Sequence, residues 1–177
     1  WTIWTFLAFA LDAIAIAAQA LIGRYLGAGD KATVRDVTRR LIHWGWIGGA
    51  VSGVMLALVS PFIGALFTAD EAVRSLLVPV LIIAALGQPI AGVAFVLDGV
   101  LIGAGDGRYL AWAGVVVLLV YAPIVVGVAW LAERSAGGGG ISGVVWVWVV
   151  ISAVFMGARL VMLLRRARSE AWMVTGA

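Results

Sequence analysis

The stretch WTIWTFLAFALDAIAIAAQALIGRYLGAGD, residues 1–30, decides the fold class of this chain. Its first 25 residues are mainly apolar; the exceptions are one aspartate, Asp12, two threonines, Gln19, and Arg24 near the end of the run. A helix that crosses a membrane needs about 20 mainly apolar residues. The glycine-rich GAGD that follows is typical of a tight turn. The stretch therefore predicts a membrane-spanning helix that ends in a turn.

The composition of the whole chain supports an integral membrane protein. Of 177 residues, 64% are hydrophobic and 12% are charged, and the mean hydropathy is +1.12. Soluble domains average about 45–50% apolar and about 25% charged residues. The net charge of +3 is concentrated in arginines between apolar runs, so we read it as loop charge and expect no nucleic-acid partner. The chain has no cysteine, which excludes disulfides and cysteine metal sites.

Five apolar runs are long enough to cross a membrane, and they predict an all-α, polytopic helix bundle. Open backbone cannot be satisfied in lipid, so the runs must be helices. The chain opens abruptly in an apolar run without Met or a basic leader, and we therefore expect residues 1–177 to be a fragment of a longer protein. The expected spans are Trp1–Tyr25, Leu41–Phe67, Leu76–Ile102, Tyr109–Ala132 and Ile141–Leu164, joined by residues 26–40, 68–75, 103–108 and 133–140.

Lysine and arginine predict the orientation, because cytoplasmic loops carry more of them. Alternating spans place nine basic residues on one side, against Arg74 and Arg134 on the other. We therefore expect a multi-pass protein of the inner (plasma) membrane, with the GAGD turns and the C-terminus in the cytoplasm. Tryptophans at the membrane boundary agree: Trp1 and Trp4 fit an outer belt, and Trp44, Trp46 and Trp112 fit an inner one.

The motif GAGD occurs twice, and we interpret both copies as cytoplasmic turns. A dinucleotide-binding glycine loop must follow a strand and open a helix inside a βαβ unit, and neither copy does. We expect Asp30 and Asp106 to cap the helices that follow. GGGG at residues 137–140 is expected to be a flexible loop. The turn residues are Gly27, Gly29, Asp30, Gly103, Gly105 and Asp106.

Polar residues inside the apolar runs are the candidate functional residues. A charge in the bilayer costs about 2.5–3.5 kcal/mol, so Asp12 and Asp98 are expected to face the bundle interior or a water-filled cavity. Each is a candidate for coupling H⁺ or Na⁺; Asp98, near the GAGD turn, could equally be structural. Gln19 shares a helical face with Asp12, and Gln88 precedes Pro89 at a possible kink; both are candidates for lining a cavity or for packing. Arg159 is expected to snorkel to the cytoplasmic surface.

No catalytic or metal-binding constellation is present. The chain has one histidine, no cysteine and no Ser–His–Asp or metal-ligand spacing. We therefore expect no enzyme activity, no metal site and no cofactor beyond a coupling ion.

Several motifs together resemble the C-terminal half of the MATE family of multidrug and toxin extrusion transporters, most closely its DinF-like branch. They are DAIAIAAQALIGRYLGAGD (residues 12–30), LFTADEAVR (66–74), VLDGVLIGAGDGR (96–108) and GARLVMLLRRARSEAW (157–172).

The resemblance implies a fold of twelve helices in two lobes, of which the five spans match helices eight to twelve. Helix seven and the N-terminal lobe, a partner in the same chain, would be missing. It implies a secondary active transporter, a cation-coupled antiporter that exports drugs or toxic organic compounds by alternating access. DinF-like relatives hold an acidic cation site in the N-terminal lobe, whereas other branches use an acid in helix ten. Asp98 lies on the matching helix but nearer the turn.

Two other interpretations remain open. A lipid-linked oligosaccharide flippase of the wider superfamily would be favoured by basic residues deep inside the helices, and these runs hold almost none. A non-transport membrane subunit or membrane-embedded transferase is the other; a prenyl-diphosphate transferase would need paired Asp-rich motifs for Mg²⁺, which the sequence lacks.

Overall fold

The computed structural model describes residues 2–135 and 141–175, and these residues form helices and turns without a strand. Five helical segments are long and apolar enough to cross a membrane, which confirms the predicted all-α membrane bundle. Trp1 and the GGGG loop lie outside the described residues. The elements are α1 (Thr2–Gly27), α2 (Lys31–Phe67), α3 (Glu71–Gly103), α4 (Gly107–Ser135), α5 (Ile141–Val149), the π-helix η1 (Val150–Phe155) and α6 (Met156–Arg168).

Two helices begin earlier than the apolar runs predict. α2 begins at Lys31 instead of Leu41, because the Asp30 carboxylate accepts a hydrogen bond from the backbone N–H of Thr33 and caps the helix. Its first turns also bury Val34 against the bundle. α3 begins at Glu71 instead of Leu76, capped by Asp70. Capping and local packing extend both helices beyond the hydrophobic signal.

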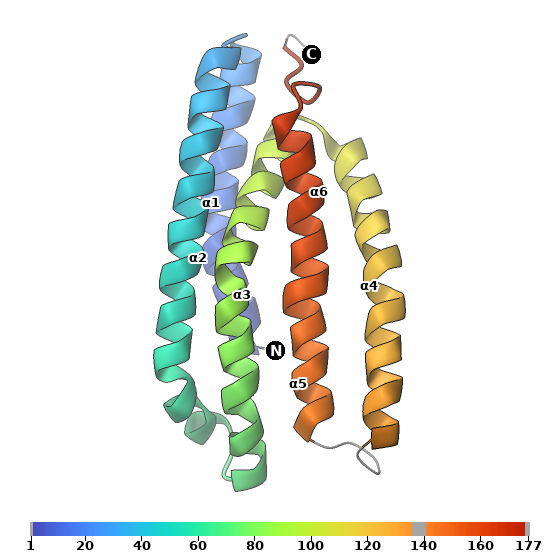
Figure 1. Cartoon of the computed structure of the whole chain (residues 1–177). Helices are drawn as coiled ribbons and strands as arrows, with labels where there is room; N and C mark the ends of the chain where they lie inside the picture. Colours follow the sequence, from blue (N-terminus) through green and yellow to red (C-terminus); the bar gives the residue numbers. More distant parts are fainter. Residues whose placement is uncertain (1, 136–140, 176–177) are drawn as a thin grey trace.

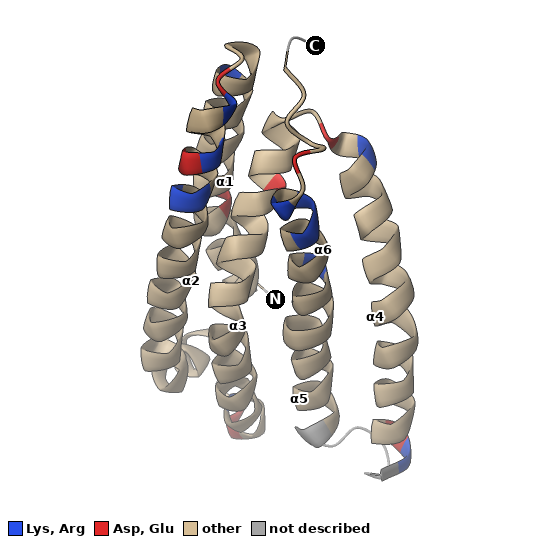
Figure 2. Ribbon diagram, turned by 45° about the horizontal axis from the view of Figure 1, so that its top comes forward, with Lys and Arg blue, Asp and Glu red and all other residues tan. Residues whose placement is uncertain are grey.

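α3 is the central helix of the bundle (Figure 1). α1 and α2 lie on one side of it, and α6 and α4 lie on the other. The α1–α2 turn, the α3–α4 turn and the C-terminus lie at the same end. Most of the basic residues gather at this end, and Figure 2 shows few charges along the middle of the helices. The predicted segregation of charge is therefore present.

Glycines bring the backbones of α1, α2 and α3 into direct contact. On α2, three glycines at four-residue spacing face α3. A Cβ on Gly49 would lie 2.3 Å from the carbonyl oxygen of Gln88, which no real Cβ tolerates. On α3, a Cβ on Gly99 would lie 2.2 Å from the carbonyl oxygen of Ala15 in α1. Small residues at this spacing let membrane helices pack closely. The glycines in these contacts are Gly45, Gly49, Gly53, Gly92, Gly99 and Gly103.

The last span changes its helical geometry in the middle. α5 passes into six residues of π-helix, η1, before α6 completes the span. A π-helical segment inside an α-helix inserts an extra residue and often lies beside a functional site. Phe155, the last residue of η1, lines one of the cavities described below.

Candidate functional site

The two GAGD turns share one backbone structure. The N–H of Asp30 donates to the carbonyl of Tyr25 at 3.0 Å, and the N–H of Asp106 donates to the carbonyl of Leu101 at 2.9 Å. The glycine before each aspartate has a positive φ, 76° at Gly29 and 75° at Gly105. This is the Schellman ending of a helix, which favours glycine. Gly27 and Gly103 are the last residues of α1 and α3.

The two turn aspartates differ in their side-chain partners. Asp30 caps α2 as predicted, and its hydrogen bonds with Thr33 lower the pKa of its carboxyl group. The prediction for Asp106 is wrong. Its carboxylate accepts hydrogen bonds from Arg166 of α6, at 2.6 Å from Nε and 3.2 Å from Nη2. A two-pronged bond to a guanidinium is stronger than a bond to one backbone N–H, and α6 lies close enough to supply it.

Asp98 lies on α3 and forms an ion pair with Arg159 of α6. The distance from Nη2 of Arg159 to Oδ1 of Asp98 is 2.6 Å, and Nε lies 3.4 Å from Oδ2. The third nitrogen, Nη1, donates to the carbonyl of Leu110 in α4 at 3.4 Å. The expectation that Arg159 snorkels to the surface is therefore wrong, because an acid within reach inside the bundle binds its guanidinium.

The spacing of charged residues in the sequence carries a signal for this pair. Asp98 of α3 lies eight residues before Asp106 of the α3–α4 turn, and Arg159 lies seven residues before Arg166 on α6. Both helices run toward the same end of the bundle, so the two acids can meet the two arginines in the same order. Matched spacing of opposite charges along two neighbouring segments indicates such a double ion pair.

A cavity of about 340 Å³ brings together three of the four candidate residues, Asp12, Gln19 and Asp98, with Arg159. Asp12 and Gln19 come from α1, Asp98 from α3 and Arg159 from α6. The apolar part of the wall includes Ala15, Ile16, Phe95 and Ile102.

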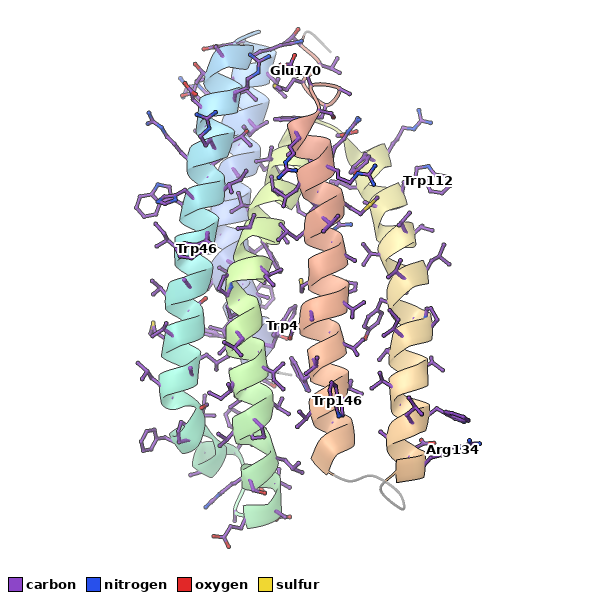
Figure 3. The ribbon with its side chains drawn as sticks, in the orientation of Figure 1. Trp4, Trp46, Trp112, Arg134, Trp146 and Glu170 are labelled. Carbon is purple, nitrogen blue, oxygen red and sulfur yellow. The ribbon has the colours of Figure 1, made fainter. Side chains whose placement is uncertain are left out.

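A second cavity of about 320 Å³ lies beside the same ion pair. Asp98 and Arg159 line it together with Trp4, Phe95 and Phe155. Trp4 was expected in an outer aromatic belt, and this expectation is wrong. Its ring packs against the apolar clusters of α2 and α3, because α1 begins beside them, and Figure 3 shows it among the helices. Aromatic walls with one ion pair suit an amphipathic ligand.

Gln88 lies apart from these residues, in the interface between α2 and α3. It is 2% exposed, and its Nε2 donates to the carbonyl of Ala84 at 3.5 Å. Its Oε1 is buried and has no hydrogen-bond partner in the described part of the chain. Gln88 lines neither of the two cavities beside Arg159.

The charges of the first cavity do not cancel. Asp98 is paired with Arg159, whereas Asp12 forms no ion pair within the described residues. With both carboxylates ionised, the cavity carries one net negative charge. Across residues 2–135 and 141–175, no group of three acidic or histidine side chains could hold a metal ion. The arrangement suits the transient binding of one monovalent cation or proton.

Comparisons with known proteins identify the family. The MatE family model matches residues 1–130. The chain is similar to Protein DETOXIFICATION 45, chloroplastic, of Arabidopsis thaliana, with 30% identity over 90% of this chain and 26% of the relative. It is similar to Protein DETOXIFICATION 44, chloroplastic (32% identity; 65% and 22%), and to Protein DETOXIFICATION 43 (28%; 90% and 28%) of the same plant. It thus spans about a quarter of these relatives, and no solved structure matches. The chain belongs to the MatE family.

Proposed function

We propose that this chain is the C-terminal lobe of a DinF-like, cation-coupled antiporter that exports drugs or other toxic organic compounds. Membership of the MatE family supports a transporter, and the names of the relatives point to detoxification. The function needs the N-terminal lobe of the same chain, because alternating access in two-lobe transporters moves one lobe against the other. No step requires an enzyme activity or a cofactor other than the coupling ion, H⁺ or Na⁺.

The observation that carries the proposal is the uncompensated carboxylate of Asp12 in a cavity that it shares with the Asp98–Arg159 pair. A free carboxylate in a low-dielectric cavity attracts a cation strongly. Asp98 is already neutralised by Arg159, so a cation reaching the cavity finds Asp12 available. We therefore assign ion coupling to Asp12 first and give Asp98 the role of holding α3 to α6.

Cation entry would act by removing the negative charge of the cavity. Once Asp12 is neutralised, the lobe no longer holds an uncompensated charge in the membrane, and this favours the opposite orientation of the transporter. Gln19, two turns further along α1, can hydrogen-bond a Na⁺-bound water or the substrate in the same cavity.

The flippase alternative receives limited support from Arg159, which is a basic residue inside the helices. Its guanidinium is bound to Asp98, however, and the net charge of the cavity is negative. An anionic, phosphate-linked substrate is disfavoured by that charge.

The proposal also includes the orientation of the bundle and the membrane that holds it. The basic end of the bundle, with both GAGD turns and the C-terminus, would face the cytoplasm by the positive-inside rule, in an inner (plasma) membrane.

The test uses the full-length protein in liposomes. Efflux of a fluorescent organic cation is measured under an imposed proton gradient and then under a sodium gradient, for the wild type, Asp12→Asn and Asp36→Asn. Asp36 is exposed on α2 and lies outside both cavities, so its variant is the matched control. We expect one of the two gradients to drive efflux from the wild type and from Asp36→Asn. Asp12→Asn should abolish this gradient-driven efflux. No efflux from the wild type under either gradient, alongside gradient-independent lipid-linked oligosaccharide movement, would contradict the proposal.

A further inference from the structure

The face of α2 that points away from the bundle has a composition that the transport site does not explain. Arg39, Arg40, His43 and Trp44 are all exposed, and they are spaced so that they share one face of the helix. The opposite face carries Gly45 and the other glycines that contact α3. Trp46 also points away from the other helices, as Figure 3 shows, and is 54% exposed.

The same helix face continues as an exposed apolar stripe. Val51, Met55, Leu58 and Phe62 follow Trp44 at intervals of three, four or seven residues, and each is at least half exposed. Along α2, the face therefore passes from guanidinium groups through an indole to aliphatic and aromatic side chains. A phospholipid shows the same order, from its phosphate through the glycerol region to its acyl chains.

The tryptophans of α4 place this face relative to a bilayer. Trp112 and Trp130 are exposed and lie 18 residues apart, or about 27 Å along the helix, close to the roughly 30 Å of a hydrocarbon core. Trp44 and Phe62 on α2 have the same separation. Arg108 precedes Trp112 by one turn, and Arg40 precedes Trp44 by one turn. Arg39 and Arg40 thus lie at the level of the lipid headgroups.

Charge favours an anionic headgroup there. Neither Arg39 nor Arg40 forms an ion pair within the described residues, whereas Arg35 is paired with Glu170 and Arg166 with Asp106. Asp36 is the one acid on this face. Guanidinium groups bind phosphate oxygens through two parallel hydrogen bonds. We infer that Arg39, Arg40 and Trp44 form a binding site for an anionic phospholipid of the leaflet at the basic end of the bundle.

The test measures lipid binding to the full-length protein. Detergent-solubilised protein is titrated with phosphatidylglycerol and, separately, with phosphatidylcholine, and bound lipid is counted by native mass spectrometry. The variant is Arg39→Gln/Arg40→Gln. The matched control is Arg165→Gln/Arg168→Gln, which removes two exposed arginines from the same end, on α6.

The site predicts tighter binding of phosphatidylglycerol than of phosphatidylcholine. The dissociation constant for phosphatidylglycerol should rise about fivefold for each arginine removed from α2, or about 25-fold for both. The α6 control should leave it within about twofold of the wild-type value. An equal loss of affinity for phosphatidylglycerol in both double variants would show that the lipid is attracted to the basic end in general, and would overturn the inference. No preference for phosphatidylglycerol, or no loss in the α2 variant because the remainder of the protein covers this face, would also overturn the inference.

Discussion

The two sides of the central helix α3 are joined in different ways. Toward α1 and α2, backbone meets backbone through glycines at four-residue spacing. Toward α4 and α6, apolar packing around the buried Leu163 is joined by side-chain ion pairs, and α4 buries only Ala113 and Val117 among its described residues. Glycine contacts cannot be exchanged without separating helices, whereas ion pairs can be re-formed with new partners. The candidate cavities lie at the boundary between these regions, where a fixed part meets an adjustable one.

The largest effect should come from breaking the glycine contacts. Gly49→Ala would push a methyl group into the backbone of Gln88 and Pro89, so α2 and α3 must separate. Overpacking of this kind costs about 3 kcal/mol. The full-length protein in detergent should show a markedly lower melting temperature. Gly127→Ala on α4, where an added Cβ would meet no described atom beyond its own helix within 4 Å, is the control and should leave the melting temperature unchanged or slightly raised. Equal melting temperatures for the two variants would show that α2 and α3 are not packed more tightly at Gly49 than α4 is at Gly127.

A smaller effect is expected from breaking the ion pair beside the cavities. Arg159→Met leaves the Asp98 carboxylate without its partner. The loss for a fully buried pair is about 3–5 kcal/mol, but these side chains remain 20% and 29% exposed, so we expect about 2 kcal/mol. Adding Asp98→Leu should restore most of the stability in chemical unfolding. If the double variant is less stable than Arg159→Met, the unpaired Asp98 carboxylate is not the cause of the stability lost in Arg159→Met.

The hydrogen bond between α4 and α6 offers a finer test of the adjustable region. The hydroxyl of Tyr109 donates to the carbonyl of Met162 at 2.7 Å. Tyr109→Phe should reduce the free energy of unfolding by about 1 kcal/mol. Tyr121→Phe, on the same helix, removes a hydroxyl that has no hydrogen bond shown within residues 2–135 and 141–175, while the ring stays edge-on to Phe155. The Tyr121→Phe variant should have the wild-type free energy of unfolding. If it loses as much stability as Tyr109→Phe, the hydrogen bond from Tyr109 to Met162 does not stabilise the protein.

The smallest effect belongs to the pair between Arg35 and Glu170. These side chains are 50% and 66% exposed, and solvent screens their attraction. Arg35→Gln should change the free energy of unfolding by less than about 0.5 kcal/mol. A change in melting as large as that of Arg159→Met would mean that exposure does not rank these ion pairs.

The number and type of helices could be predicted from the sequence, because runs of 20 apolar residues leave the backbone no other choice in lipid. The two GAGD turns could be predicted as well, since a glycine with positive φ ends each helix. The start of α2 could not. Residues 31–40 carry no hydrophobic signal, and it is the cap at Asp30 and the buried Val34 that make them helical.

The site could be predicted only in part, because a sequence gives positions along a helix and not the neighbours across it. Asp12, Gln19 and Asp98 were found because polar residues stand out in apolar runs. Arg159 was assigned to the surface because a long side chain can reach either outward or inward, and only the position of α3 decides. Gln88 stood out in the same way, but it faces α2, since the glycines there leave it room.

The most direct test of the account compares the two aspartates of the cavity in full-length protein reconstituted into liposomes. Gradient-driven efflux of a fluorescent organic cation is measured for Asp12→Asn and for Asp98→Asn/Arg159→Gln, which removes both members of the pair and keeps the net charge of the cavity. If Asp12 couples the ion, Asp12→Asn abolishes coupled efflux, whereas the double variant retains most of it. Normal efflux in Asp12→Asn together with complete loss in the double variant would contradict this assignment and move the coupling site to Asp98.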